Sequence, residues 1–428
     1  MTEKTSNLPA LQPKGAEVDA VRSGGALLSR VASDATSHIS TFVKKMHRIG
    51  DYDFNEQSYR QILIWLQQIN AVSNNIPSNG RNISTEDLFQ LKDVNDSNLN
   101  LLFNGDIIEV VFEFTFKEFD LTYVPNLQRL IFSWGSELTF LDLTNVPKLT
   151  DLGCSCGQLT ELDLSRVPNL TQLDCSSNQL SKLDLSRVPN LTQLDCSSNR
   201  LSKLELSHVP NLMSLKLCGN EIADFDLSDV PNLTDLSCDW KQLTQMNLSH
   251  VPNLKSLNLY NCNWNHLNET HLTHVKNLKF LGLHRSQIYK LELPKLSNLH
   301  FLVCNNNYLT YIDLSQAPNL TRLHCFNNKL IKLDLSQAPN LTKLECSGNQ
   351  LTELDLSQAP NLTEINCGRN QLTELDLSNV PSLTSLICTD NRLTDIDIRR
   401  CETSDLYIKH DASVTVHKRD DQILRSRR

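Results

Sequence analysis

The sequence predicts a solenoid of about 13 coils of 21 residues, and three observations support this fold class. A unit of about 21 residues recurs from Val124 to Arg400, and it is clearest as V-P-N-L-T-Q-L-D-C-S-S-N-Q-L-S-K-L-D-L-S-R from Val167 to Arg187. Leucine recurs at fixed positions of the unit, and a cysteine often stands eight residues after its start. Self-similarity at this period is the signature of a leucine-rich-repeat solenoid, whose strands form a parallel sheet on the concave side.

The core side of each strand is predicted from the frame L-x-x-L-x-C-x-x-N. Side chains alternate along a strand, so the cysteine points into the core together with the leucines. We therefore expect buried free thiols, with a disulfide ladder as the alternative, and no metal site because no C-x-x-C occurs. In four coils the slot holds Phe132, Leu217, Leu259 or Leu283. The nine cysteines of this slot are Cys154, Cys175, Cys196, Cys238, Cys304, Cys325, Cys346, Cys367 and Cys388.

The turn and the convex side follow from three other residue types. The asparagine of the frame, for example Asn178, is expected to hydrogen-bond buried backbone groups at the turn. Eleven of the 15 prolines stand at the second position of a coil, which predicts extended or short 3-10 segments on the convex side. Aspartates such as Asp163 and Asp184 form an acidic stripe there, which we interpret as structural, because hard cations need clustered oxygens.

The composition divides the chain into four segments. Residues 1–35 are rich in small and polar residues and are expected to form a disordered leader. Residues 36–122 contain two stretches with helical apolar spacing and one strand-like stretch, which predict a small, mainly helical N-terminal cap. Residues 123–400 form the repeat domain, and residues 401–428 are expected to form a C-terminal cap and a basic tail. A separate activity in residues 36–122 is the alternative to a simple cap.

The repeat frame resembles a known family. The pattern L-x-x-L-x-C-x-x-N-x-L-x-x-L-D-L-S-x-x-P is similar to the cysteine-ladder repeats of internalin-like proteins and of leucine-rich-repeat effectors from intracellular bacterial pathogens. Internalins carry a signal peptide and often a cell-wall anchor, whereas residues 1–30 show no apolar h-region and no L-P-x-T-G occurs. The resemblance therefore implies an effector that is secreted without a Sec signal peptide and acts in the host-cell cytoplasm. The bacterial cytoplasm is the alternative location.

These features together predict a non-enzymatic scaffold that binds a host protein on its concave face. No nucleotide-binding, nucleophile-elbow or kinase motif occurs, so we expect neither catalysis nor a cofactor. The alternative is the substrate-recognition part of a ubiquitin-ligase-type or other enzymatic system, whose activity would lie in residues 36–122 or in a recruited partner. Because residues 1–120 contain no cysteine, a ligase nucleophile has no place there.

Charge and hydropathy narrow the partner class. The formal net charge of −9 disfavours nucleic acid, which needs a basic footprint. No run of about 18 apolar residues is present, so we expect no membrane span. We expect a monomer, since nothing in the repeat pattern calls for a second copy.

The predicted partner site lies where the repeat departs from its own pattern. From Ser256 onward, the strand positions that project from the concave face change from acidic and hydroxyl residues to aromatic and basic ones. The adjacent coil, Val251 to His274, is 24 residues long and carries Trp264 and His266. The alternative is that the rings fold back onto their own coils. The predicted partner-binding residues are Trp240, Tyr260, Phe280, His284, Arg285, Phe301, Val303, Arg322, His324 and Phe326.

Overall fold

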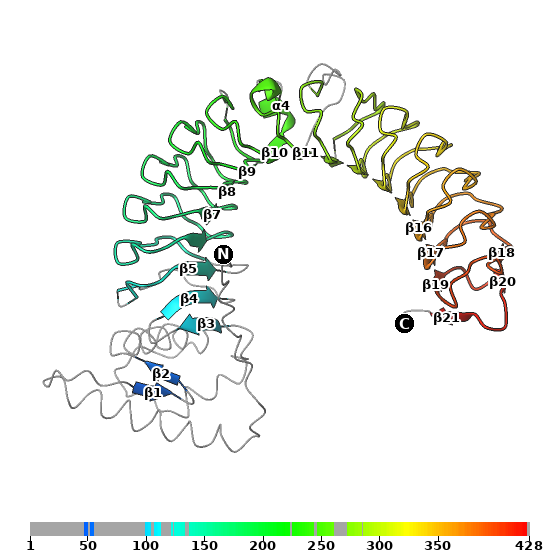
Figure 1. The fold of residues 1–428 in the computed structure, drawn as a ribbon, viewed down its shortest axis with the longest axis horizontal. Helices are drawn as coiled ribbons and strands as arrows, with labels where there is room; N and C mark the ends of the chain where they lie inside the picture. The colour runs from blue at the N-terminus through cyan, green and yellow to red at the C-terminus, as the bar shows by residue number, and fades with distance from the viewer. Residues whose placement is uncertain are drawn as a thin grey trace, which may run out of the picture.

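The computed structural model shows an arc of stacked coils (Figure 1). The residues it describes are 47–49, 52–54, 99–103, 107–112, 121–122, 124–132, 137–222, 225–243, 246–260, 272–284 and 286–425. For the strands before residue 121, the description covers the backbone only. The predicted leader and the predicted helices of the N-terminal cap lie outside the described residues.

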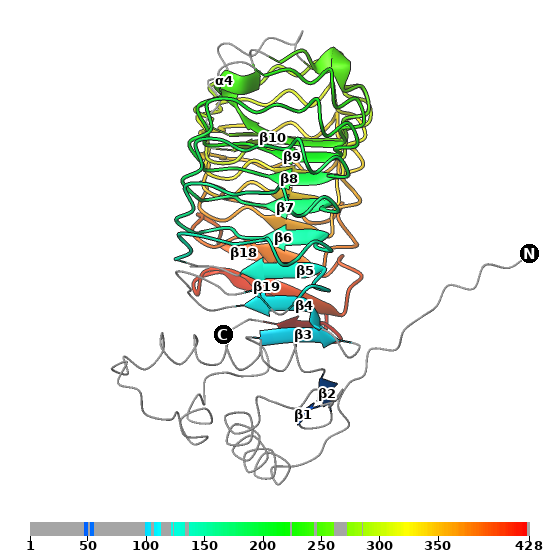
Figure 2. The same ribbon diagram turned by 90° about the vertical axis from the view of Figure 1, so that its left-hand side faces the viewer.

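One long sheet lines the inner side of the arc, and its strands stack one above another (Figures 1 and 2). It starts with β3 (Leu99–Phe103), which is antiparallel to β4 (Ile107–Phe112), and every later neighbour is parallel. The strands that follow in order are β5 (Arg129–Phe132), β6 (Asp151–Gly153), β7 (Gln172–Asp174), β8 (Gln193–Asp195), β9 (Ser214–Lys216), β10 (Asp235–Asp239), β11 (Ser256–Tyr260), β12 (Phe280–His284), β13 (Phe301–Val303), β14 (Arg322–His324), β15 (Lys343–Glu345), β16 (Glu364–Asn366), β17 (Ser385–Ile387), β19 (Asp405–Lys409) and β21 (Ile423–Arg425).

The period of the sequence sets the register of this sheet. Gln172 of β7 pairs with Gln193 of β8, and Gln193 pairs with Ser214 of β9, so equivalent residues of regular coils lie side by side. The predicted solenoid of about 13 coils with a parallel concave sheet is therefore confirmed. Two further pairs lie outside the main sheet: β1 (His47–Ile49) with β2 (Tyr52–Phe54), antiparallel, and β18 (Asp395–Asp397) with β20 (Thr415–His417), parallel.

The core consists of leucines and cysteines, as predicted. All nine cysteines of the repeated slot are at most 1% exposed, and they are free thiols. Phe132, Leu217, Leu259 and Leu283, which replace cysteine in four coils, are equally buried. Burial raises the pKa of the thiols, for example to about 12 for Cys304. These nine cysteines, here called the cysteine column, are thus part of the hydrophobic core.

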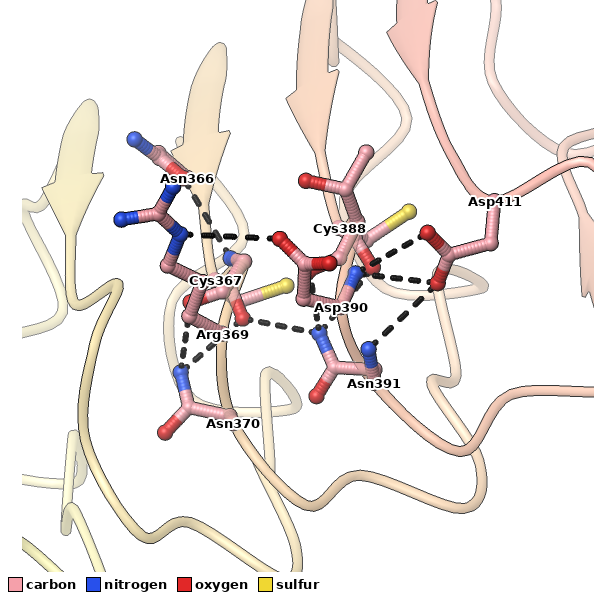
Figure 3. Close-up of polar contacts among 10 residues, drawn as sticks. Asn366, Cys367, Arg369, Asn370, Cys388, Asp390, Asn391 and Asp411 are labelled. Carbon is pink, nitrogen blue, oxygen red and sulfur yellow. Dashed lines mark hydrogen bonds and ion pairs between the residues drawn. The ribbon is translucent and has the colours of Figure 1, made fainter.

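The asparagines of the repeat frame, here called the asparagine column, form hydrogen bonds with backbone groups at the turns. The Nδ2 atom of Asn391 donates hydrogen bonds to the carbonyl oxygens of Cys367 (3.1 Å) and Cys388 (3.0 Å) (Figure 3). Its Oδ1 atom accepts a hydrogen bond from the backbone N–H of Leu372. The same bonds recur in earlier coils, for example at Asn178. Each side chain therefore links two coils and satisfies polar groups that the core would otherwise leave unpaired.

Glutamine replaces asparagine where the coil changes shape. In the coil of β10 the turn contains the short helix α4 (Trp240–Leu243), and Gln242 is 1% exposed. Its Nε2 donates to the Leu217 carbonyl (3.4 Å) and its Oε1 accepts from the N–H of Asp239 (2.9 Å). Gln422, next to β21, makes similar bonds to the carbonyls of Ile398 and Cys401. The sequence pattern did not predict either substitution.

Over the described residues, the convex side consists of turns and one 3-10 segment, η1 (Leu248–His250), as the prolines predict. The acidic stripe has a local role there. Asp163 Oδ1 accepts a hydrogen bond from the N–H of Ser165 (2.8 Å), which lowers the pKa of the carboxyl group. Equivalent aspartates repeat this contact in other coils, for example Asp355 with Ser357. The interpretation of the stripe as structural is consistent with these contacts. Within the described segments, no helix is long and apolar enough to cross a membrane.

Candidate functional site

The candidate site lies on the concave face over β11 to β14. The parallel register places Phe280 of β12 beside Phe301 of β13, and Phe301 beside Arg322 of β14. His324 lies two residues further along β14, so its side chain projects from the same face as that of Arg322. The strands therefore bring together four of the ten predicted residues. We call Phe280, Phe301, Arg322 and His324 the aromatic cluster.

Phe301 is the centre of the aromatic cluster. Its ring meets the Phe280 ring edge-on, with centroids 5.1 Å apart and planes at 74°. It meets His324 in the same way at 4.7 Å and 76°. The guanidinium carbon of Arg322 lies 4.2 Å from the Phe301 ring centroid. Such aromatic pairs contribute about 0.5 to 1.5 kcal/mol beyond their area burial, so the cluster is held in one arrangement before any partner arrives.

The cluster is packed but still accessible. Phe280, Phe301 and His324 are half-buried, and Arg322 is exposed. Phe326 is half-buried, and Tyr260 at the end of β11 is 39% exposed. Phe301 thus contacts side chains of neighbouring coils, whereas the alternative hypothesis placed the rings back on their own coils, and each ring keeps part of its surface open. Packed but accessible rings are the kind of anchor that dominates binding free energy at protein interfaces.

Val303 must be removed from the predicted site. Its side chain projects from the same face as that of Phe301 but is only 5% exposed, so it has almost no area to offer a partner. It lies in register between Gly282 of β12 and His324 of β14. On the same face, the longer side chains of Phe301 and His324 have their ring centroids 4.7 Å apart, and they leave little exposed area to the short valine side chain. Arg285 lies outside the described residues, and for Trp240 and His284 only the backbone is described.

His324 is neutral near pH 7 for a physical reason. Burial, the largest effect, lowers the pKa of its imidazole, while Glu345 opposes this shift. Its Nε2 atom is covered and has no hydrogen-bond partner among the described residues. A neutral ring suits the edge-on contact with Phe301.

Charged residues that the sequence reasoning missed border the cluster. Lys343 of β15 forms ion pairs with Glu364 of β16 (2.8 Å) and with Glu345 (3.4 Å). Asn366 donates a hydrogen bond to Glu345 at 2.9 Å. These residues occupy the same projecting strand positions as Arg322 and His324, so extending the position-by-position comparison by two coils would have found them.

Two of the aspartates on the concave face of the earlier coils are paired with basic side chains. Asp195 forms an ion pair with Lys216 (3.2 Å), and Asp151 forms one with Arg129 (2.8 Å). Asp174 accepts hydrogen bonds from both the N–H and the hydroxyl of Ser176. Asp151 and Asp195 are therefore neutralised within the protein, whereas Asp174 keeps its charge and is held by hydrogen bonds.

Two other features of the surface are weaker candidates. A shallow groove follows the rim at the start of β13 to β17, where threonine hydroxyls and asparagine amides bond to carbonyls of the preceding coil. Its polar groups thus have a structural role. No group of three or more His, Cys, Asp or Glu side chains suited to a metal ion occurs within the described ranges. Residues 261–271 of the long coil, with Trp264 and His266, lie outside them.

The comparisons with known proteins agree on the fold. A family model described as leucine-rich repeats (2 copies) matches residues 168–208. No curated protein matches the chain.

Among solved structures, the functional domain of InlJ from Listeria monocytogenes, which includes a cysteine ladder, is 27% identical over 74% of this chain and 67% of its own, with a TM-score of 0.46. A leucine-rich-repeat protein of Leptospira interrogans is 22% identical, with coverage of 76% and 90% and a TM-score of 0.56. The Toll–Spatzle complex of Drosophila is 19% identical, with coverage of 67% and 43% and a TM-score of 0.53. The Leptospira and Drosophila similarities show the leucine-rich-repeat fold.

Proposed function

We propose that this protein is a non-enzymatic scaffold that holds a protein partner on its concave face through the aromatic cluster. The observation that carries the proposal is the contact of Phe301 with Phe280, His324 and Arg322. The ordinary coils place Gln172 and Gln193 at the position of these two phenylalanines. The cluster is therefore not needed to build a coil, and aromatic and arginine side chains are the usual anchors of protein interfaces.

The charges near the cluster favour protein over nucleic acid. Lys343, which lies in register with Arg322 on the next strand, is already paired with Glu345 and Glu364. Phosphate binding requires lysines and arginines whose charges are available, and the chain as a whole carries a net charge of −9. A partner that offers an apolar projection with an acidic or carbonyl group beside it fits the cluster better.

The partner proposed here is a host protein, and the scaffold acts as a bacterial effector in the host-cell cytoplasm. Support comes from the similarity of the repeat frame to cysteine-ladder repeats of such proteins. The free thiols of the cysteine column suit a reducing compartment. The bacterial cytoplasm, which is also reducing, is the alternative location.

The test compares proteins captured from host-cell cytosol by the wild type and by a Phe280→Gln/Phe301→Gln variant. Glutamine already stands at this strand position in two coils, so we expect the variant to fold normally. Two lost anchors of about 2 kcal/mol each should together reduce affinity for the captured protein roughly 700-fold. A Gln172→Ala/Gln193→Ala variant is the matched control and should bind like the wild type. Equal binding by the wild type and the phenylalanine variant would show that the proposed site is wrong.

A further inference from the structure

Three basic side chains border the aromatic cluster at the rim where the strands begin. Lys255, Lys279 and His300, here called the basic column, stand directly before β11, β12 and β13. The backbone N–H of Lys279 donates to the Lys255 carbonyl at 2.7 Å, and that of His300 donates to the Lys279 carbonyl at 2.9 Å. These bonds place the three residues one above another in successive coils.

Regular coils fill this position with threonine, which has a structural role. The hydroxyl of Thr171, for example, donates to the Thr150 carbonyl of the preceding coil at 2.9 Å. The members of the basic column are exposed instead, and His300 Nδ1 hydrogen-bonds to the carbonyl oxygen of Asn298 at 2.6 Å. Coil formation therefore does not require basic side chains here.

The positive charges beside the phenylalanine rings are available to a partner. Within the described part of the chain, neither Lys255 nor Lys279 forms an ion pair, and the same holds for Arg322. Lys279 directly precedes Phe280, whereas Arg322 lies in register with Phe301 on the next strand. Cationic groups therefore stand on two sides of the paired rings, at the rim and on β14.

Carboxylates limit the length of this positive region. On the side of the earlier coils, Asp235 is exposed and lies in register with Ser256. On the side of the later coils, Lys343 is paired with Glu345 and Glu364. The steps from β11 to β14 span three strand spacings, or roughly 14 Å, which an extended segment of about four residues covers.

We propose that the basic column and the aromatic cluster together recognise a short acidic segment of the partner protein, with one large apolar side chain between its carboxylates. The apolar side chain contacts the rings of Phe280 and Phe301. Carboxylates on one side of it face Lys255 and Lys279, and a carboxylate on the other side faces Arg322. This preference rests on the proposed function and specifies the chemistry of its partner. An apolar anchor supplies affinity, and the complementary charges around it supply specificity.

A nucleic acid fits this surface less well than an acidic peptide. A single strand binds through several successive phosphates, and the phosphates beyond the positive region would approach Asp235 or Glu364. The next cation along the sheet, Lys343, is already neutralised. A short acidic segment ends before it meets these carboxylates.

The test measures binding of fluorescein-labelled probes to the full chain by fluorescence anisotropy. The probes are the peptides G-E-E-F-E-E-G, G-K-K-F-K-K-G and G-E-E-A-E-E-G, and an oligothymidylate of about ten nucleotides. The wild type should bind G-E-E-F-E-E-G at least about 10-fold more tightly than each of the other three. Equal or tighter binding of any other probe overturns the proposal. Absence of binding of G-E-E-F-E-E-G up to about 1 mM also overturns it.

A pair of variants assigns the preference to the basic column. Lys255→Thr/Lys279→Thr introduces the threonine of regular coils, so it should fold normally and bind G-E-E-F-E-E-G about 10-fold more weakly. Lys182→Thr/Lys203→Thr is the matched control, because it removes the same charge at exposed positions outside the strands. The control should bind like the wild type. Equal losses in both variants, or no loss in the first, overturn the assignment.

Capture from host-cell cytosol separates a failure of this preference from a failure of the proposed function. Loss of the captured protein in both Phe280→Gln/Phe301→Gln and Lys255→Thr/Lys279→Thr agrees with an acidic segment on the aromatic cluster. Loss in the phenylalanine variant with full retention in the lysine variant keeps the site but overturns its acidic preference. Full retention in the phenylalanine variant overturns the site itself.

Discussion

Arg322 and His324, two residues apart on β14, both contact the ring of Phe301 on the neighbouring strand. Side chains two residues apart project from the same face of a strand, and the parallel register places Arg322 beside Phe301. One ring therefore receives a cation on its face and an imidazole at close range. This arrangement depends on two coils, so neither coil could form it alone.

The Arg322 contact is expected to matter more for binding than for folding. Arg322→Ala should lower the free energy of unfolding by no more than about 1 kcal/mol, because the side chain is exposed. Affinity for the captured partner should fall about 30-fold. Urea denaturation and a binding titration measure the two effects. A large loss of stability without loss of affinity would assign Arg322 a purely structural role.

The asparagine column predicts a contrast between two asparagines of the same coil. Asn328 is buried and bonds to the carbonyls of Cys304 and Cys325, each at 3.0 Å, and to the N–H of Leu309. Asn328→Ala should therefore cost about 2 to 3 kcal/mol, because buried backbone groups lose their partners. Asn319 is exposed and makes one bond, so Asn319→Ala should cost less than about 0.5 kcal/mol. Chemical denaturation of both variants measures the difference, and similar costs would contradict this account of the column.

The cysteine column should be chemically silent in the folded protein. Burial raises the pKa of the Cys304, Cys346 and Cys388 thiols to about 12, so at pH 8 almost none is a thiolate, the reactive form. A thiol reagent should modify these residues only after denaturant is added. Mass spectrometry of peptides from the native and the unfolded protein identifies the modified sites. Rapid labelling of the column under native conditions would contradict the packing described.

The acidic stripe predicts a loss of stability in acid. The Asp355 carboxyl accepts the Ser357 N–H, which lowers its folded-state pKa below the unfolded value. The same type of contact, with Arg399 bonded by its side chain and backbone, lowers the pKa of Asp397 to about 2. A lowered pKa gives stability that is fully present above the unfolded value of about 4 and is lost as the pH falls toward 2. Urea midpoints should therefore drop between pH 5 and pH 2.

A variant separates this effect from general acid denaturation. Asp355→Asn keeps an oxygen that can accept the Ser357 N–H but removes the titrating group. Its urea midpoint should fall less steeply between pH 5 and pH 2 than that of the wild type. An identical slope would show that this aspartate contributes nothing to the pH dependence.

The sequence by itself determined the fold, because in a solenoid the neighbour in space is the residue one period away in the chain. The spacing of Cys325 and Cys346 therefore predicted both their burial and their adjacency, and the prolines predicted turns on the convex side. The candidate site was predicted in part for the same reason. Phe280, Phe301 and Arg322 come from equivalent positions of successive coils, and the structure places them together.

Only the tertiary structure determined the features that depend on how side chains of different size pack against one another. Val303 has the strand position of an exposed residue, but its neighbours in other coils cover it. Gln242 takes over the role of asparagine because α4 changes the path of its turn. The stacking of Tyr289 on Tyr308 joins positions that differ within the repeat. A periodic pattern states which backbone positions are equivalent, whereas exposure and contact depend on the size and direction of the particular side chains that meet across coils.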